Sequence, residues 1–505
     1  RLVSKTLLLV WLVFSAPVLG IPTEVGADPS QAAEKTIRAV KTEIPPEIDG
    51  SIESVWARAD SVTEFIQTEP REGEPATERT VAYLLYDDQN LYVAFKCYDS
   101  EPKKLVVVVG PRGDASGDYI RFFIDTFGDK VTAYEFRVNA AGVQDDFCVF
   151  SDGEHSDKGW DGVWYSAAKV TDFGYVVEIK IPFKSLRYKK GLSRWGIGFE
   201  RWICRKEERA HWLPQKSGQF RISRLAQLVG IRPGEMGLHL ELYPVVLARY
   251  DKPSTSSDAG LDFSWHPTSS SSFQFTANPD FAQVEADPYR VNLSKYEIYL
   301  VERRPFFVEG LALFELRAML PFYSRRIGKR LPGGGEVPIL GGSKFIARPG
   351  RFEIGALSAL TGEVEYTDDD TTRVEPQSWY SVFRVKRRFL ENSELGFLYA
   401  GRQGDGFSRV LTLGGVLRAR DLGFGLLCAY TDKTKAESGY GSKFNFAWIT
   451  SDFQARGYAL YMGEHLDVSP VGFYPWVGKK ELCFWGGPIL HNKGPFKKMS
   501  FSFKG

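Results

Sequence analysis

A loop rich in side-chain oxygens, between residues 151 and 161, is the best candidate for metal chemistry. Its acidic members are Asp152, Glu154, Asp157 and Asp161. Calcium takes ~6–8 oxygen ligands, so such a loop could hold a structural calcium ion. The spacing is not that of an EF-hand, and a solvated acidic loop without a metal is the simpler interpretation.

Motifs for catalysis are missing from the sequence. None of the six histidines belongs to an HExxH motif, and there is no GxSxG elbow and no P-loop. Two carboxylate pairs occur, Asp145-Asp146 and Glu207-Glu208. A glycosidase needs two carboxyls across a cleft, ~5–9.5 Å apart, which adjacency in sequence does not establish. We therefore name no catalytic residue.

Length and composition limit the classes of protein and partner. A chain of 505 residues is too long for one core, so at least two domains are expected. The net charge of +1 is spread along the chain and argues against a nucleic-acid partner, which needs a basic face. Phe, Trp and Tyr make up 14% of the residues, which favours β-structure because flat rings pack well on pleated sheets.

The first 35 residues resemble export and linker sequence. Arg1 and Lys5 precede the apolar run at 6–14, and Val18 and Gly20 suit the −3 and −1 positions of a cleavage site. We expect a signal peptide at 1–20 and a linker rich in Pro, Gly and Ala at 21–35. The chain begins with Arg rather than Met, so we expect a truncated or misassigned start.

Residues 36–231 read as an antiparallel β-sandwich. Short alternating segments recur with turn signals between them, for example 81–86 and 90–98 on either side of an Asp87–Asn90 turn. Further strands are expected at 119–127, 131–138, 163–170, 175–181 and 195–202. The only short helix expected in this half covers 51–59. Many short strands with regular turns are typical of a sandwich.

The pattern changes after Arg232-Pro233-Gly234, and we expect a transmembrane β-barrel over 235–505. Segments of about ten residues alternate, as in 422–430, where Leu422, Phe424 and Leu426 share one face. No run other than 6–14 approaches the ~20 apolar residues of a membrane helix, so a membrane-spanning chain would need a closed barrel. A large soluble sandwich shows the same period with its apolar face inward. The signal peptide and the long series of strands favour the barrel.

Charged side chains in the second half would face the lumen of such a barrel. A cation at the lipid midplane costs ~2–4 kcal/mol, so the strand cations Arg384, Lys386, Arg418 and Arg420 should point inward. A second charged group comprises Glu302, Arg303, Arg304, Glu309, Arg325 and Arg326. This group could form a selective constriction or brace the barrel through ion pairs, and we favour bracing.

The first domain resembles the family nine carbohydrate-binding modules. The resemblance rests on Ile48-Asp49-Gly50 with Trp56, and on the segments 84–102, 119–127, 134–142 and 160–186. It covers most of residues 36–231 and consists mainly of framework residues. It implies a sandwich that binds a glycan, and related modules also hold structural calcium.

The second half resembles the domain-of-unknown-function family 5916. The motif NPDFAQVEADPYRVNLSKYEIYLVERRPFFVEG at 278–310 carries the resemblance, supported by 322–328 and 388–403. It implies an outer-membrane barrel. Members of that family usually run longer, so a barrel left incomplete within this chain is an alternative.

Sugar binding requires flat aromatic rings together with polar groups for the hydroxyls. The candidate ligand-binding residues in the sandwich are Trp160, Trp212, Tyr119 and Trp202. Trp160 and Trp212 lie in polar loop contexts. Trp56, Trp164 and Trp195 lie in apolar patterns and are expected in the core.

The sequence thus predicts an all-β, carbohydrate-binding protein of the outer membrane. Its sandwich, expected in the periplasm, would bind a glycan, and its barrel would serve as anchor or pore in contact with lipid. One alternative is a glycoside hydrolase or associated protein of carbohydrate catabolism. Another is a structural envelope protein without a ligand.

Overall fold

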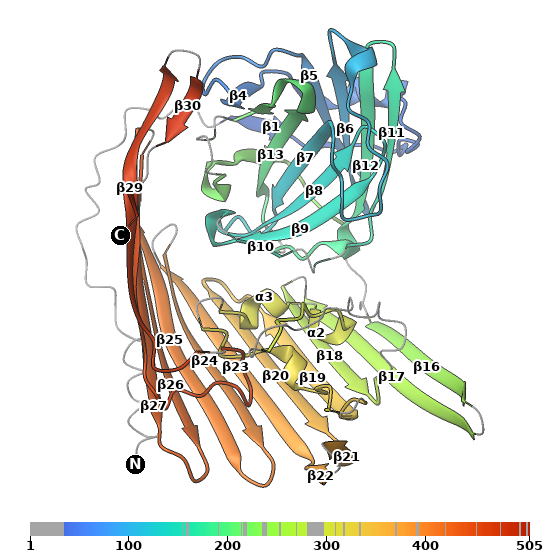
Figure 1. Cartoon of the computed structure of the whole chain (residues 1–505). Coiled ribbons are helices and arrows are strands. Elements are labelled where there is room, and N and C mark those ends of the chain that lie inside the picture. The colour runs from blue at the N-terminus through green and yellow to red at the C-terminus, as the bar shows by residue number, and fades with distance from the viewer. Residues whose placement is uncertain are drawn as a thin grey trace.

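Strands form almost all of the regular structure in the computed structural model (Figure 1). The structure describes residues 35–505 except 154, 158–159, 161, 190, 214, 216–219, 235–239, 252–253, 269, 280–296, 309, 317–318, 333–334, 369–370, 390–392, 420, 451, 475, 494–495, 501–502 and 505. The expected signal peptide, and the expected linker apart from Lys35, lie outside the described residues. So does most of the motif at 278–310.

The first half is a sandwich of a nine-stranded and a six-stranded sheet. The nine-stranded sheet contains β1 (Thr36–Arg38), β4 (Ile66–Glu69), β7 (Tyr119–Asp125), β8 (Ala133–Asn139), β9 (Gln144–Phe150), β10 (His155–Asp157), β13 (Arg194–Ile203), β14 (Glu208–His211) and β15 (Ala226–Val229). The six-stranded sheet contains β2 (Val40–Lys41), β3 (Asp60–Val62), β5 (Thr80–Tyr86), β6 (Asn90–Tyr98), β11 (Tyr165–Thr171) and β12 (Gly174–Pro182). All strands predicted for this half are present, which confirms the sandwich.

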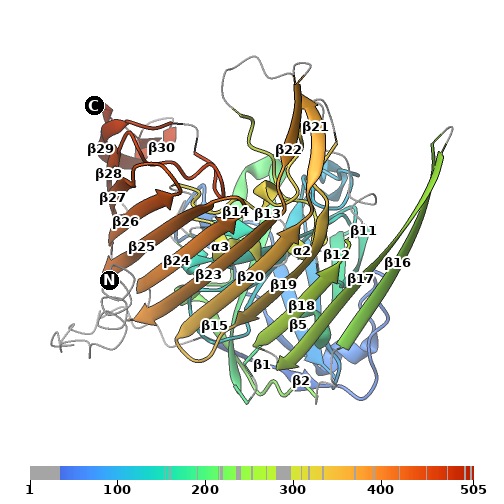
Figure 2. The same ribbon diagram turned by 90° about the horizontal axis from the view of Figure 1, so that it is seen from below.

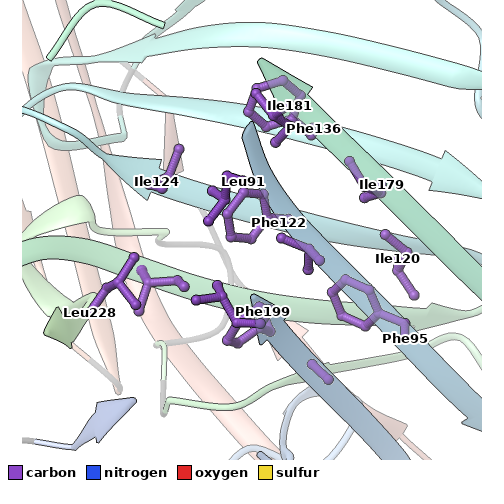
Figure 3. Close-up of a cluster of buried hydrophobic side chains, with 14 of the residues drawn as sticks. Leu91, Phe95, Ile120, Phe122, Ile124, Phe136, Ile179, Ile181, Phe199 and Leu228 are labelled. Carbon is purple, nitrogen blue, oxygen red and sulfur yellow. The ribbon is translucent and has the colours of Figure 1, made fainter. Parts of the chain in front are cut away.

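The core of the sandwich lies between the two sheets. Alternate side chains of each strand point inward, and Figure 3 shows Phe95 and Leu91 from β6 facing Phe122 from β7 and Phe199 from β13. The rings of Phe199 and Phe95 have centroids 5.7 Å apart. Two facing apolar surfaces therefore exclude water from the centre.

The Ile48-Asp49-Gly50 motif is held in place by a buried carboxylate on β12. Glu178 Oε2 accepts hydrogen bonds from the backbone N–H of Gly50 (2.8 Å) and Ser51 (3.1 Å), and Oε1 accepts one from Trp56 Nε1 (2.8 Å). Gly50 has φ +82°, a conformation that favours glycine. The predicted helix at 51–59 is only a 3-10 turn, η1 (Ser54–Arg58), which places Trp56 in the core.

The second half is one antiparallel 14-stranded sheet. In order along the sheet, its strands are β16 (Leu240–Asp251), β17 (Ser254–Thr268), β18 (Ser271–Ala277), β19 (Ile339–Ala347), β20 (Phe352–Thr361), β23 (Ser378–Phe389), β24 (Ser393–Gln403), β25 (Phe407–Ala419), β26 (Leu422–Lys433), β27 (Gly439–Ile449), β28 (Phe453–Met462), β29 (Lys480–Lys493) and β30 (Phe496–Ser500), with β31 (Phe503–Lys504) also on β29. A separate hairpin consists of β21 (Val364–Asp368) and β22 (Thr371–Glu375). Among the described residues β16 pairs with β17 and β30 with β29, and Figure 2 places β16 and β29 at opposite edges. The expected closure into a barrel is therefore not confirmed.

The convex side of this sheet carries exposed apolar side chains. They are Leu261, Trp265, Phe275, Leu340, Phe345, Trp379, Phe383, Leu417, Leu422, Phe424, Leu426, Tyr440, Phe444, Trp448, Tyr461, Leu482 and Phe484. We call this set the outer belt. The intervening positions point to the concave side and include buried polar residues such as Lys344, Glu353, Arg384 and Thr412. The predicted alternation is therefore present, with its apolar side exposed.

A segment with short helices covers part of the concave side. It contains α2 (Pro305–Val308), α3 (Leu311–Phe314) and the 3-10 turn η7 (Ser324–Arg326). Phe307 and Phe314 pack in a cluster with Leu357, Val382 and Leu398 from the strands. Figure 1 shows α2 and α3 between the sheet and the sandwich. Among the described residues, no helix has the length and apolar character needed to cross a bilayer.

Candidate functional site

The outer face of the nine-stranded sheet gathers charged and aromatic side chains from four neighbouring strands. Pairing places Arg121 of β7 opposite Glu200 of β13 and Arg137 of β8, and His211 of β14 opposite Glu200. Residues directly opposite on adjacent strands have side chains on the same face, ~4.5–5.5 Å apart at Cβ. The strand register therefore assembles the cluster.

Arg121 is the centre of an ion network on this face. Its Nε donates to Glu135 Oε1 at 2.7 Å, and its Nη1 lies 3.1 Å from Glu200 Oε1. Arg137 Nη2 reaches Glu135 Oε1 at 3.2 Å, and His211 Nε2 lies 3.1 Å from Glu200 Oε2. The charges of opposite sign alternate, so each carboxylate is partnered.

Burial and charge together set the protonation of this network. Burial raises the pKa of Glu200, but Arg121, His211 and Arg209 more than offset it, and the pKa is lowered to about 2. Burial lowers the pKa of His211 to about 4; Glu200 opposes this shift, and Arg121 and Arg209 add to it. Glu200 is therefore ionised and His211 neutral near pH 7.

A row of four stacked side chains lies beside the network. The rings of Tyr119 and Trp202 have centroids 6.4 Å apart and an interplanar angle of 22°. The guanidinium of Arg137 lies 4.8 Å from the Tyr119 ring centroid, and that of Arg209 lies 5.2 Å from the Trp202 centroid. We call Arg137, Tyr119, Trp202 and Arg209 the stacked row. The structure thus brings together two of the four predicted ligand residues.

The stacked row offers several groups to a polar ligand. Tyr119 and Trp202 are half-buried, and the side chains of Arg137 and Arg209 are 22% and 34% exposed. Apolar ring edges beside guanidinium donors and carboxylate acceptors suit a polyhydroxylated ligand.

The other two predicted ligand residues lie elsewhere. Trp212 lies among polar neighbours in sequence but is only 5% exposed and packs on Phe199, with centroids 5.8 Å apart. Trp160 is partly buried against the core, 4.7 Å from the Tyr134 centroid. Both rings fill gaps at the rim of the core. Trp56, Trp164 and Trp195 are buried, as expected.

Sequence reasoning missed the charged members of this face. Arg121 lies two positions after Tyr119 and so points to the same side of β7, and period-two spacing was the signal for it. Arg137, Glu135, Glu200 and Arg209 come from strands whose register is not visible in the sequence.

Asp152 is the one candidate calcium ligand of the oxygen-rich loop whose side chain the structure describes. Asp152 accepts hydrogen bonds from Ser223 N at 2.7 Å and Ser223 Oγ at 3.0 Å, and it lies 3.6 Å from Arg221 Nη1. Its oxygens thus brace the chain locally. Glu154, Asp161 and the side chain of Asp157 lie outside the described residues. The calcium site therefore stays a prediction.

The charged group after residue 301 braces the segment on the concave side. Arg304 forms a bidentate pair with Glu302 (2.9 and 2.7 Å), and Ser324 Oγ donates to Glu302 at 2.6 Å. Arg326 pairs with Glu297 at 2.9 and 2.7 Å. Arg325 lies 3.7 Å from Glu302, and the Arg303 backbone N–H donates to Glu302 at 3.0 Å. These contacts favour bracing over a constriction; Glu309 lies outside the described residues.

Three of the four strand cations line a cavity on the concave side. Arg384, Lys386 and Arg418 contribute to its wall, and Arg420 lies outside the described residues. The orientation predicted for these three cations is therefore confirmed.

The carboxylate pairs have internal partners. Glu208 accepts from Thr77 N at 2.8 Å and from Thr77 Oγ1 at 2.6 Å. Asp146 accepts from Gly162 N at 2.7 Å, and Asp145 lies 3.5 Å from Arg137 on the other face of β9.

Two family descriptions match the chain. Residues 48–214 match "Carbohydrate family 9 binding domain-like", and residues 237–406 match "Domain of unknown function (DUF5916)". Among curated proteins, Exoglucanase XynX of Acetivibrio thermocellus is 30% identical over 160 residues, 31% of this chain. Endo-1,4-beta-xylanase A of Thermoanaerobacterium saccharolyticum is 27% identical over 168 residues, 32% of this chain. The matched part spans only 13% of either relative's length.

A solved structure is also similar. It is a family 9 carbohydrate binding module from Caldicellulosiruptor kristjanssonii in complex with cellotriose, 18% identical, with a TM-score of 0.30. The match covers 40% of this chain and 95% of that domain. The two family matches cover different parts of the chain, residues 48–214 and residues 237–406, and each covers less than half of it.

Proposed function

We propose that the protein binds a glycan on the outer face of its sandwich and is held in the outer membrane by its 14-stranded sheet. The observation that carries the glycan-binding part is the stacked row beside the Arg121 network, on a domain of a carbohydrate-binding family.

The geometry of the stacked row constrains how a sugar would bind. A sugar ring in contact with two flanking rings requires centroids at least about 7–8 Å apart, since each carbon contact needs about 3.5–4.0 Å. Tyr119 and Trp202 are 6.4 Å apart, so a sugar does not fit between them. We therefore place the sugar across the exposed edges of the row, where guanidinium and carboxylate groups meet its hydroxyls.

Calorimetric titration of the detergent-solubilised chain with cellotriose tests the sugar site. Cellotriose is the sugar bound in the similar solved module. Trp202→Ala should lower the affinity for cellotriose about tenfold, because contacts between a sugar and an aromatic ring are typically worth about 1 kcal/mol or more. The change also removes the ring on which Tyr119 stacks. The matched control is Tyr165→Ala, since Tyr165 is exposed on the opposite sheet. Equal loss in both variants, or no binding by the parent protein, would refute this site.

The outer belt supports membrane anchoring. Large exposed apolar surfaces are rare on water-soluble monomers, and here they extend from β17 to β29. Trp, Tyr and Phe occur in the belt together with Leu, and the concave side is polar and charged outside the packed segment. This distribution is the one lipid requires of a membrane sheet. We further propose that the sandwich lies on the periplasmic side, as barrels usually keep both termini there.

Fractionation of expressing cells tests the anchor. The protein should partition with the outer membrane and show heat-modifiable migration after detergent extraction. Recovery as a detergent-free soluble monomer would overturn the anchoring while leaving the sugar site to be judged by its own titration.

A further inference from the structure

A cavity of about 870 Å³ lies between the sandwich and the concave side of the 14-stranded sheet. The sandwich contributes Phe220 and Arg221, and strands β20 to β29 contribute most of the remaining wall. Ligand-binding pockets typically hold ~300–1,000 Å³, so the cavity is large enough for an oligosaccharide. It is separate from the stacked row described above.

Most of the charged side chains in the described wall of the cavity are cations. Its charged side chains are Arg221, Arg384, Lys386, Arg418, Lys443 and Arg456 against Glu315, Glu353 and Glu394. Two of the carboxylates are already paired: Glu394 with Lys386 at 2.9 Å, and Glu353 with Arg348 at 2.8 Å. Among the described residues of the wall, cations therefore outnumber carboxylates by six to three.

Arg384 is the most unusual group in this wall. Its exposed fraction is only 4%, and its Nε and Nη1 have no hydrogen-bond partner among the described residues. A buried guanidinium with unused donors is costly unless an anion satisfies it. Arg384 lines the cavity, so an anion bound there could accept from it.

Glycines on the inner face keep space free around Arg384. A Cβ at Gly396 would lie 2.8 Å from Arg384 Nη2, and a Cβ at Gly425 would lie 2.6 Å from Asn445 Oδ1. Side chains at these positions would displace the guanidinium and the amide. The glycines thus leave room for the Arg384 guanidinium and the Asn445 amide in the wall of the cavity.

Aromatic rings share the cavity with the cations. Tyr458 and Trp485 line it with ring centroids 6.4 Å apart, and Phe220 contributes from the sandwich. Rings suit the apolar faces of a sugar, and Asn445 can bind hydroxyls through both its donors and its acceptor. The combination matches a saccharide that carries carboxylates better than a small inorganic anion.

We propose that this cavity is a second binding site, which takes an acidic saccharide whose carboxylate pairs with Arg384. The proposal goes beyond glycan binding on the sandwich face and does not depend on it. The sandwich closes one side of the cavity, so a ligand there would contact both domains.

The test compares tri-galacturonate with its neutral methyl ester by calorimetric titration of the full chain in detergent. The acid should bind at least about tenfold more tightly than the ester, and the difference should shrink as salt is added. Equal affinity of acid and ester, or no binding of the acid, would overturn the proposal.

Variants locate the site. Arg384→Gln should weaken binding of the acid about tenfold or more and leave the ester unchanged, whereas Arg384→Lys should retain most of the affinity. Arg373→Gln is the matched control, because Arg373 lies on the separate β21–β22 hairpin and pairs there with Asp368. If Arg384→Gln does not fold, judged by heat-modifiable migration, Arg418→Gln takes its place. Unchanged affinity in a folded variant would contradict the assignment.

The sandwich face is tested separately. Trp202→Ala should lower the affinity for cellotriose about tenfold but leave the affinity for tri-galacturonate in the cavity unchanged. Loss of both ligands in Trp202→Ala would mean that the acid also binds to the sandwich face, which would refute the second site.

Discussion

The sandwich and the 14-stranded sheet use the same period-two alternation in opposite senses. In the sandwich, Phe122 and Phe199 are buried between two sheets and charged residues such as Arg121 lie on the outer face. In the 14-stranded sheet, Phe383 and Phe444 are exposed on the convex side, and Arg384 is buried on the concave side. The same pattern in sequence thus describes two different environments.

The comparison shows that the period fixes which residues share a face but not which medium that face meets. A strand alternates because successive side chains point to opposite faces. Whether the apolar face meets another sheet or a lipid depends on what covers it. In the sandwich a second sheet does so, and on the outer belt no described residue does.

The largest effect should come from a charge in the outer belt. Phe444→Arg places a cation on the face proposed to meet lipid, which costs ~2–4 kcal/mol near the midplane. We expect loss of outer-membrane assembly, measured by heat-modifiable migration of membrane fractions. The control Tyr165→Arg, on the exposed outer face of the sandwich, should assemble normally. Normal assembly of Phe444→Arg would contradict the proposal that the outer belt meets lipid.

The same Phe→Ala change should have different effects in the two halves. Phe199→Ala removes a ring that is 1% exposed and should cost ~3–5 kcal/mol of sandwich stability. Phe383→Ala removes a ring that is 42% exposed and should cost less than about 1.5 kcal/mol in detergent. Thermal unfolding followed by near-ultraviolet circular dichroism measures both. Similar losses in the two variants would show that the two environments do not differ.

The sandwich should lose stability in mild acid because of His211. The pKa of His211 is lowered in the folded state to about 4 from the ordinary 6.5. The free energy of unfolding is therefore unaffected by His211 above pH 6.5 and falls as the pH is lowered toward 4, because the unfolded chain takes up the proton first. We expect a loss on the order of 2 kcal/mol across this window, which His211→Gln should reduce. Titration of the unfolding midpoint with pH measures it. His465→Gln is the control, since His465 is exposed; an unchanged pH profile in His211→Gln would contradict the assignment.

The smallest effect should come from the contact between the two halves. Arg388 of β23 forms an ion pair with Asp129 of the sandwich. Arg388→Gln should lower the stability of the docked arrangement by about 1 kcal/mol. Hydrogen exchange at 127–132 should then become faster, while exchange at 364–375 should stay unchanged. No change at 127–132 would show that other contacts hold the domains together.

The sequence was sufficient to predict the elements and the alternation but not the faces of the sites. Leu422, Phe424 and Leu426 were correctly grouped because spacing along one strand determines their face. Spacing along one strand also puts Arg121 on the same face as Tyr119, yet its pairing with Glu200 depends on a register between strands about 80 residues apart. The packing of Trp212 on Phe199 could not be predicted, because its polar neighbours in sequence say nothing about contacts between strands. The cavity around Arg384 is lined by residues of both domains, so it could not be predicted without knowing how the two domains pack together.

The central claim is that the outer belt meets lipid, and a nitroxide scan of 440–448 in liposomes tests it most directly. Each position is changed singly to Cys in a background where the five native cysteines are replaced by Ser. We predict that probes at 440, 444 and 448 collide preferentially with oxygen dissolved in lipid, and that probes at 441, 443 and 445 collide with a water-soluble nickel complex. Equal access of the nickel complex to all positions would contradict the claim. So would preferential collision of the probes at 440, 444 and 448 with the nickel complex.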